Sequence, residues 1–219
     1  MVCKRIIDIA GAIILLAVLS PLLLVLAGLV AYNFGAPVLY YSPRTGYKGR
    51  IFQAIKFRSM PNIFGADGKL LPDGQRLTHF SHFIRSTSMD ELPQLLNILK
   101  GEMSFIGPRP QLVEFTPYFK PNEMRRLDML PGITGWAQVN GRNLISWDKR
   151  LELDAWYVDN WSLTLDFKIA LKTLPVWLQM QGISTPGHAT SPRLDECRML
   201  EEKAAKPAAA PVSSALHDA

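Results

Sequence analysis

An apolar run near the N-terminus constrains this chain most, because so long a run must be shielded from water. Between residues 6 and 32 the only strongly polar side chains are Asp8 and Ser20, and a run of this length is typical of a membrane-spanning helix. Ser20-Pro21 lies near its middle, where proline removes a helical hydrogen bond and clashes with the preceding turn. We therefore predict a helix that bends at Ser20-Pro21.

The bend divides the run into two arms of about 13 residues, roughly 20 Å each, which is shorter than the ~30 Å hydrocarbon core. Both ends of the run carry positive charge, which marks the cytoplasmic side of a membrane. The flanking residues are Lys4, Arg5, Arg44, Lys48 and Arg50. A re-entrant helix that enters and leaves through one face fits this pattern better than a simple spanning anchor, which stays the alternative. No small-residue cleavage site follows, which disfavours a signal peptide.

The length of 219 residues suits one catalytic domain plus the anchor. We predict a re-entrant helix over residues 1–35, a catalytic domain over 36–187, and a largely disordered tail over 188–219. The net charge of +5 is compatible with anionic lipid, a phosphorylated substrate or nucleic acid. Cys3 and Cys197 lie at opposite ends of the chain, so neither a disulfide framework nor a zinc site is indicated.

Downstream, the pattern predicts an α+β fold that is mainly helical. Residues 38–41 and 51–55 are β-prone and separated by turn formers, which predicts a hairpin near the membrane. Residues 61–76 predict a loop, and 131–142 a second, glycine-bearing loop. Amphipathic patterns predict helices over 115–130, 147–161 and 163–180, the last either buried or at the membrane interface. Low complexity from Glu201 onward predicts disorder.

The segment 88–110 carries the chemistry. Pro93 is tolerated only in the first turn of a helix, which makes Asp90 the expected N-cap and places Glu91 at the first helical position. A leucine stripe follows, at residues 92, 95, 96 and 99, and Gly101 is placed to end the helix. Asp90 is either a plain helix cap or a carboxylate kept ionised for nucleophilic or metal-binding work.

Cations near this pair favour phosphate chemistry. Arg85 precedes it, and Arg109 is held between two prolines in a GPRP sequence, which directs a fork of donors suited to phosphate oxygens. Lys56 and Arg58 are further candidates, with an ordinary solvated strand end as the alternative. His79 and His82 lack a third ligand nearby, which favours a surface role. The chain has no P-loop and no GxGxxG sequence, so standard nucleotide-binding folds are not supported.

Three sequence blocks together resemble a known family. They are KFRSM at 56–60, RSTSMDELPQLLNILKGEMSFIGPRP at 85–110 and PGITGWAQVNGR at 131–142. They closely resemble the bacterial sugar transferases, or monotopic phosphoglycosyl transferases, over a stretch from the anchor to about Gly187. The chain is similar to the small members of the family, such as the enzyme that transfers phospho-diacetylbacillosamine in protein N-glycosylation, and unlike the larger members with additional spanning helices.

The resemblance implies transfer of a sugar 1-phosphate from a UDP-sugar to polyprenyl phosphate, usually undecaprenyl phosphate, with release of UMP. It implies that Asp90 attacks the β-phosphate and forms a covalent phosphosugar intermediate, and that Mg²⁺ assists at Asp90 and Glu91. Glu91 then helps to ligate the metal or to deprotonate the acceptor, while Arg109 holds a phosphate oxygen. Lys56, Arg58 and Arg85 support the same site. Gln138, Asn140 and Arg142 are assigned to nucleotide or sugar binding.

The family's re-entrant helix, with a Ser-Pro at its break, also matches Ser20-Pro21. It implies a monotopic protein of the inner membrane with its catalytic domain on the cytoplasmic face, acting on lipid and nucleotide sugar and not on nucleic acid.

Two other functions remain open from the residues themselves. In a membrane-tethered scaffold, Asp90 merely caps a helix, and Asp90→Asn lowers stability by roughly 1 kcal/mol at most. A glycosyltransferase that moves the sugar alone releases UDP, although such enzymes commonly carry a DxD sequence that this chain lacks. The sequence identifies neither the sugar nor the oligomeric state.

Overall fold

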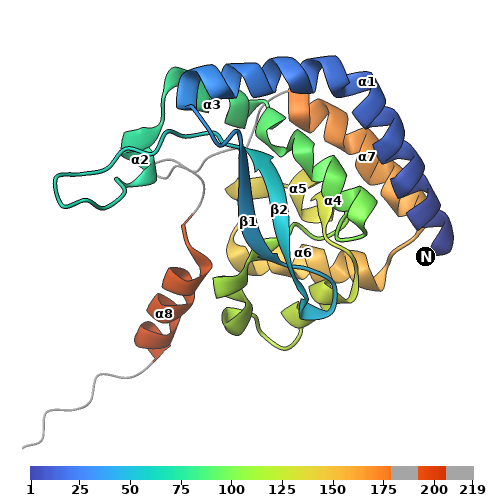
Figure 1. Ribbon diagram of the computed structural model, residues 1–219. Coiled ribbons are helices and arrows are strands. Elements are labelled where there is room, and N and C mark those ends of the chain that lie inside the picture. Colours follow the sequence, from blue (N-terminus) through green and yellow to red (C-terminus); the bar gives the residue numbers. More distant parts are fainter. Residues whose placement is uncertain (179–191, 206–219) are drawn as a thin grey trace, which may run out of the picture.

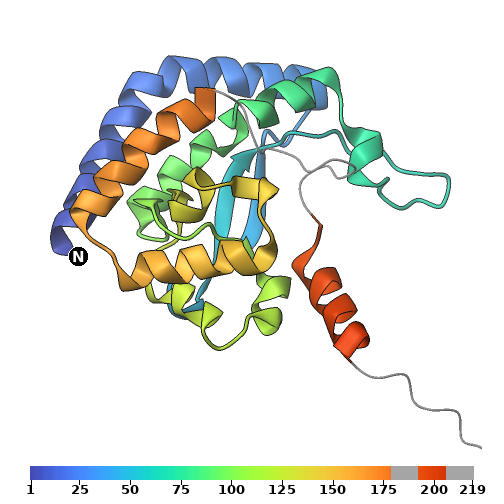
Figure 2. The same ribbon diagram turned by 180° about the vertical axis from the view of Figure 1, so that it is seen from behind.

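The computed structural model describes residues 1–178 and 192–205. Its first element is helix α1 (Val2–Phe34), which includes Pro21. Figures 1 and 2 show α1 curving around the domain, so that its two halves lie along different sides. Among the described residues α1 is the one helix long and apolar enough to cross a membrane, and only 11% of its most apolar stretch is buried. The predicted apolar helix is present, and it bends.

The N-terminal half of α1 is fixed to the domain by polar side chains. Lys4 Nζ donates to Asp166 Oδ2 at 2.6 Å, and both residues are buried. Asp8 Oδ1 accepts a hydrogen bond of 3.0 Å from the Ser104 hydroxyl. Charged groups that are buried in pairs resist separation, because either one alone is costly to bury. This half of the helix is therefore tied to the domain.

The C-terminal half of α1 packs by apolar contacts. Leu26 and Val30 are buried in one cluster with Phe57 and Ile84, which come from the hairpin and from helix α3 (His79–Ser86). Each buried side chain of this size stabilises the contact by about 1.5–3 kcal/mol. Both ends of a single apolar helix thus contact the same domain.

The predicted hairpin is confirmed and is longer than expected. Strands β1 (Leu39–Thr45) and β2 (Ile51–Phe57) pair antiparallel, joined by the turn η1 (Tyr47–Gly49), and β4 (Gln111–Leu112) pairs with the free edge of β1. The strand order is therefore β2-β1-β4. Within the predicted loop 61–76, a bridge joins Phe64 to Leu70 and a short helix α2 covers Asp73–Arg76.

The helix predicted after residue 88 begins differently. Ser88 is the N-cap, in a left-handed conformation with φ of 56°, so the prediction of Asp90 as N-cap is wrong. The first segment is a 3-10 helix, η2 (Met89–Gln94), followed by α4 (Leu95–Lys100). A 3-10 turn changes the angular spacing of side chains, and as a result Ile98 is buried in the core while Leu96 is 38% exposed.

The predicted end of this helix is confirmed. Gly101 is its C-cap with φ of 85°, a left-handed conformation that glycine adopts without a steric penalty. Arg5 from α1 donates to the carbonyls of Ile98 and Leu99, at 2.6 and 3.2 Å. These carbonyls belong to the last turn and lack a helical partner, so α1 also helps to end α4.

The segment predicted as a glycine-bearing loop contains short regular elements. Strand β5 (Gly132–Thr134) pairs parallel with β3 (Ser104–Ile106), and α5 (Trp136–Val139) and η5 (Arg142–Leu144) follow. A Cβ atom on Gly132 would collide with the backbone of Gly107. The glycines of this segment therefore serve a close approach of two backbone segments rather than a free loop.

The prediction of one amphipathic helix over 115–130 is wrong. The segment forms two separate 3-10 helices, η3 (Val113–Tyr118) and η4 (Glu123–Asp128). Pro117 lies inside η3, and Pro121 lies between η3 and η4. Proline lacks the N–H that a continuing α-helix needs. The sequence therefore has the apolar spacing of a helix, but no continuous α-helix forms.

The next two predicted helices are present as α6 (Trp147–Asp159) and α7 (Leu163–Leu178), and the predicted residues 179–180 lie outside the described part. Helix α7 buries Ile169 completely, and on its other side exposes an apolar stripe. The stripe consists of Leu163, Phe167, Leu171 and Leu174, which are 42–65% exposed. Figures 1 and 2 show α7 running beside α1.

Part of the segment predicted as a disordered tail is helical. Helix α8 (Leu194–Ala205) lies within residues 188–219 and continues past Glu201. Leu194 is fully buried beside Phe115, Phe119 and Leu151, which fixes the start of α8 to the domain. Residues 188–191 and 206–219 lie outside the described part of the chain.

Candidate active site

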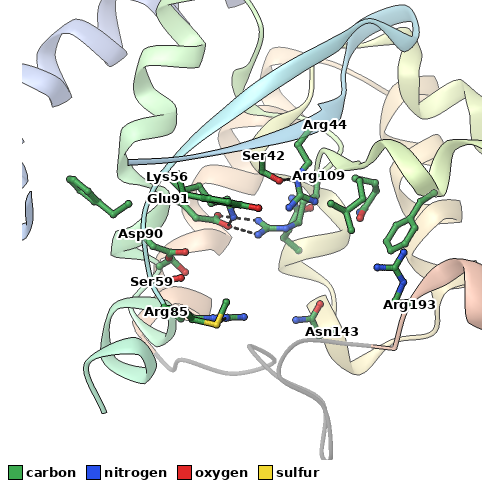
Figure 3. A pocket seen from close by; sticks show the side chains of 18 of the residues that line it. Ser42, Arg44, Lys56, Ser59, Arg85, Asp90, Glu91, Arg109, Asn143 and Arg193 are labelled. Carbon is green, nitrogen blue, oxygen red and sulfur yellow. Dashed lines mark hydrogen bonds and ion pairs between the residues drawn. The ribbon is translucent and has the colours of Figure 1, made fainter. Parts of the chain in front are cut away.

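A cavity of about 650 Å³ opens between the hairpin, η2, α5 and α6 (Figure 3). Among the described residues its wall is strongly cationic. It carries the cations Arg44, Lys56, Arg58, Arg76, Arg85, Arg109, Arg150 and Arg193, and the carboxylates Asp90, Glu91 and Asp154. Such an excess of positive charge in a concave site favours an anionic ligand.

Asp90 lies in the wall of this cavity with only 9% of its surface exposed. No group within residues 1–178 and 192–205 donates a hydrogen bond to its carboxylate. Burial raises the pKa of Asp90 from 3.8 to about 6; Lys56 opposes this shift and the charge of Glu91 adds to it. Above that pH, Asp90 is an ionised carboxylate that is poorly solvated and directed at the cavity (Figure 3).

Glu91, the adjacent residue, is engaged by two cations. Lys56 Nζ lies 2.6 Å from its Oε1, and Arg109 binds both carboxylate oxygens, at 2.5 Å to Oε1 and 3.2 Å to Oε2. Burial alone would raise the pKa of Glu91, but Arg109 and Lys56 outweigh it and hold that pKa well below its usual range.

The expected role of Glu91 as a general base does not fit this geometry. A general base works best with a pKa near the operating pH, whereas Arg109 and Lys56 hold the pKa of Glu91 well below its usual range. Among the described residues its Oε2 accepts one bond, from Arg109 at 3.2 Å, so this oxygen keeps a lone pair for a metal ion. The position of Glu91 also fixes the directions of Lys56 and Arg109.

Arg44 was not predicted as a site residue. It lines the cavity on the same strand as Tyr40 and Ser42, and Ser42 Oγ accepts its Nε–H at 3.1 Å. Burial, together with the nearby guanidinium of Arg109, lowers the pKa of Arg44 to about 10. The alternation at positions 40, 42 and 44 places these side chains on one face of the strand, a signal that could have identified Arg44 once the hairpin was predicted.

Arg85 and Arg58 both line the cavity, and backbone carbonyls engage the guanidinium of Arg58. Arg85 extends from α3 into the cavity wall near Asp90 (Figure 3), with Nη1 3.5 Å from Met60 Sδ. Arg58 borders the cavity, but its guanidinium donates to the carbonyls of Phe34 and Gly35. Carbonyls at a helix C-terminus attract a cation, so Arg58 caps the end of α1.

The structure places the three residues predicted for nucleotide or sugar binding in different surroundings. Gln138 lines the cavity and is 9% exposed. Asn140 is not in the wall as described; its Nδ2 donates to the carbonyl of Trp136 at 2.7 Å, within the turn that ends α5. The side chain of Arg142 lies outside the described part. The neighbouring Asn143 does line the cavity.

Helix α6 and the segment just before α8 supply wall residues that the sequence did not indicate. Arg150 and Asp154 come from α6, one turn apart, and Arg193 precedes α8. Arg193 pairs with Glu114 at 2.5 Å, and the Pro192 carbonyl accepts the Trp147 indole N–H at 2.9 Å. Only the i, i+4 spacing of Arg150 and Asp154 is visible in the sequence, and it is typical of any helix face.

A metal site is only partly supported by the donor set. Within the described residues no cluster of three His, Cys, Asp or Glu side chains could hold a metal ion. Mg²⁺, however, is commonly bound through one or two carboxylates plus substrate phosphates and water. Asp90 offers a carboxylate that accepts no hydrogen bond from the described residues, and Glu91 Oε2 accepts one, so these two adjacent carboxylates fit such a site.

Comparison with known proteins finds a matching family and several similar proteins. The family model for bacterial sugar transferases matches residues 1–180. The uncharacterized sugar transferase EpsL of Bacillus subtilis is 47% identical over 193 residues, covering 88% of this chain and 96% of that protein. The undecaprenyl-phosphate galactose phosphotransferase of Salmonella typhimurium is 39% identical over 197 residues, covering 82% of this chain and 41% of that protein.

A glucose-1-phosphate transferase of Klebsiella pneumoniae, which acts between UDP-glucose and undecaprenyl phosphate, is 39% identical over 185 residues. The match covers 80% of this chain and 40% of that protein. The chain thus spans nearly all of one relative and about two fifths of the other two. The family resemblance predicted from the three sequence blocks is confirmed: this chain belongs to the bacterial sugar transferase family.

Proposed function

We propose that this protein transfers a sugar 1-phosphate from a UDP-sugar to polyprenyl phosphate, releasing UMP and forming a polyprenyl diphosphate sugar. The names of the Salmonella and Klebsiella relatives, both of which act on undecaprenyl phosphate, support the lipid acceptor and the sugar phosphate. One observation supports the proposal most strongly: the buried carboxylate of Asp90, which accepts no hydrogen bond from the described residues, faces a cavity rich in cations.

The first step follows from the state of Asp90. An Asp90 carboxylate oxygen attacks the β-phosphorus of the UDP-sugar, the bond from that phosphorus to the bridging oxygen breaks, and UMP leaves with the electron pair. A nucleophile that is weakly solvated and free of hydrogen bonds reacts without first losing partners. The product of this step is an acyl phosphate that joins Asp90 to the sugar.

The second step regenerates the enzyme. A phosphate oxygen of the lipid attacks the same phosphorus, the bond to Asp90 breaks, and the carboxylate is restored. Lys56 and Arg109, held in place by Glu91, and Arg44 on the adjacent strand are the cations near the reacting groups. They offset the charge of two phosphorylated substrates that enter one site in turn.

We propose Mg²⁺ as the cofactor, bound through Asp90 and the donor diphosphate. When bound, it supplies Lewis-acid polarisation of the phosphate oxygens. The protein contributes the orientation of Asp90 and the surrounding guanidinium groups. Glu91 accepts hydrogen bonds from Lys56 and Arg109, and we assign it to positioning these two cations, with its Oε2 available to the metal.

The membrane arrangement that we propose is re-entrant and monotopic. Lys4 and Asp8 at one end of α1, and Leu26 and Val30 toward the other, contact the same domain. A straight helix of 33 residues extends about 50 Å at 1.5 Å per residue, so a straight span would carry one end away from the domain. The exposed apolar residues of α1 and the stripe on α7 form a surface suited to the bilayer interface.

We place the domain on the cytoplasmic face, since basic residues flank both ends of the apolar run. Nucleotide sugars are cytoplasmic, so this placement also gives Asp90 access to its donor.

Nucleotide release from a panel of UDP-sugars tests the proposal. The detergent-solubilised full chain is incubated with UDP-glucose, UDP-galactose or UDP-N-acetylglucosamine, with undecaprenyl phosphate, and with Mg²⁺ or a chelator. We expect Mg²⁺-dependent UMP from at least one donor, and none from Asp90→Asn. The matched control is Asp128→Asn, which changes a carboxylate that is 45% exposed and paired with Lys48 outside the cavity. Release of UDP instead of UMP would show direct glycosyl transfer and contradict the proposal.

A further inference from the structure

Among the described side chains of the cavity wall, the amide of Gln138 and the carboxylate of Asp154 have buried polar atoms without a partner, as does Arg58 at Nε. Gln138 is 9% exposed, and both its Nε2 and its Oε1 are buried with no hydrogen bond among the described residues. Asp154 is 1% exposed, and its Oδ1 is in the same state. A buried polar atom left unsatisfied is costly and rare in a native protein. All three atoms of Gln138 and Asp154 belong to residues that line one cavity, which points to a ligand that completes them.

Both side chains are held by packed surroundings. Arg126 is buried and donates to Asp154 Oδ2 from Nη2 at 2.8 Å and from Nε at 3.2 Å, which fixes that carboxylate and leaves Oδ1 unused. Trp136 stacks on Trp156 with ring centroids 5.2 Å apart. This stack joins α5, which carries Gln138, to α6, which carries Asp154. The unsatisfied atoms are therefore fixed in position before a ligand enters.

The chemistry of these atoms favours a hydroxyl over a phosphate as their partner. The carboxylate of Asp154 is acceptor-only when ionised and repels an anion, whereas the amide of Gln138 both donates and accepts. A hydroxyl group also donates and accepts, and neighbouring hydroxyls on a ring offer both functions to an amide and a carboxylate together. The cations around Glu91 are Lys56 and Arg109 (Figure 3). Arg109 and Arg150 also act on Asp154 through their charge, so the unsatisfied atoms lie beside cations that suit phosphate.

We propose that Gln138 and Asp154 form a subsite for a hydroxyl-bearing ring of the substrate, beside the cations that suit its phosphates. The inference rests on the proposed function, which supplies a UDP-sugar as the ligand. Two rings of that donor carry hydroxyls, the transferred sugar and the ribose. The subsite selects the donor by its hydroxyls, and it takes no part in the bond-making at Asp90.

The first test uses Gln138→Met, which keeps the length of the side chain and removes its polar atoms. Affinity for the UDP-sugar that the wild type binds is measured by calorimetry on the full chain in detergent, and thermal stability is measured without ligand. We expect the affinity to fall about 3- to 10-fold, the effect of one lost neutral hydrogen bond. We expect the thermal midpoint of the free protein to rise, because an unsatisfied amide is no longer buried.

Opposite changes in affinity and stability separate a binding role from a packing role, since loss of packing would lower both. Gln53→Met is the matched control; Gln53 is exposed on β2 and does not line the cavity. This control is expected to leave the affinity unchanged. A buried water that already satisfied Gln138 would leave the affinity of Gln138→Met unchanged, and that result would overturn the inference.

The second test removes the hydroxyl from the ligand. For the wild type we expect at least one monodeoxy UDP-sugar to bind more weakly than its parent, or 2′-deoxy-UMP to bind more weakly than UMP. The first result identifies the transferred sugar as the occupant, and the second identifies the ribose. In Gln138→Met and in Asp154→Asn the parent-to-deoxy affinity ratio should fall toward one. A ratio of affinities does not depend on the fraction of folded protein, so partial unfolding of Asp154→Asn does not affect it.

The two proposals fail differently. Unchanged affinities and ratios in both variants, with Asp90-dependent UMP release intact, would overturn the hydroxyl subsite alone. A wild type that binds no UDP-sugar and releases no nucleotide would overturn the proposed function, and this inference with it.

Discussion

Replacing Asp90 with Asn should stabilise the folded protein above pH 6, although Asp90 is a catalytic candidate. A carboxyl group whose pKa is raised on folding, here from 3.8 to about 6, binds its proton more tightly in the folded chain than in the unfolded chain. Its ionisation therefore destabilises the fold progressively as pH rises from 3.8 through 6, and the loss is complete above that range. The physical cause is the burial of an anion, only partly offset by Lys56.

The expected size follows from the shift. At pH 8 the ionised group opposes folding by about 3 kcal/mol, and at pH 5 by roughly half of that. Asn cannot ionise, so the stability of Asp90→Asn relative to wild type should be greater at pH 8 than at pH 5 by about 1–2 kcal/mol. Taking the difference between two pH values cancels the change in packing that the amide itself causes.

Chemical denaturation in a zwitterionic detergent, followed by tryptophan fluorescence at both pH values, measures this difference. Asp128→Asn serves as the control and should change stability by less than about 0.5 kcal/mol at either pH, because its ion pair with Lys48 is exposed. A stability difference between Asp90→Asn and wild type that does not vary with pH, or an Asp90→Asn variant less stable than wild type at pH 8, would refute the reasoning. The second result is what a simple helix cap predicts.

Three further predictions follow from the same contacts. The rate kcat/KM should increase with pH through about 6 as Asp90 ionises, and a rate that does not change between pH 5 and 7 would contradict this. Arg109→Lys loses the two-pronged contact with Glu91 and should lower kcat/KM in initial-rate assays by about 10- to 100-fold; a change within twofold would argue against it. Lys4→Met leaves Asp166 buried without its cation and should lower the unfolding free energy by about 3–5 kcal/mol, measured by denaturation; a loss under about 1 kcal/mol would show the pair to be dispensable.

The parts of the fold that the sequence predicted are those set by local pattern. The apolar helix, the hairpin and α6 each follow from a periodicity carried within a few turns or residues. The helix predicted over 115–130 failed because the prolines at 117 and 121 break a pattern that is otherwise amphipathic. The tail prediction failed over α8 because the contacts of Leu194 are with residues more than forty positions away.

For the candidate site too, the sequence indicated residues that are close together in the chain and missed a residue that only the packing of the fold brings there. Asp90 and Glu91 were found because they are adjacent and lie in one short block with Arg85 and Arg109. Asp154 was missed, since only the packing of α6 against the rest of the domain brings it to the cavity.

Two side chains that were predicted to bind substrate, Arg58 and Asn140, donate to backbone carbonyls. Such carbonyls compete with ligands for donor groups. Arg58 meets the end of α1, a helix that closes more than twenty residues earlier in the chain. Asn140 donates to a carbonyl in its own turn. Sequence indicates which donors a site could use, whereas the fold decides which of them are already engaged.

The covalent role of Asp90 is tested most directly by mass spectrometry of the intact protein after incubation with a UDP-sugar and Mg²⁺ in the absence of lipid. The expected result is a mass increase equal to one phosphosugar, located at Asp90 by peptide fragmentation, absent from Asp90→Asn, and lost when undecaprenyl phosphate is added. Full turnover of donor to UMP by the wild type with lipid, without any adduct when lipid is withheld or the reaction is quenched early, would contradict a covalent intermediate.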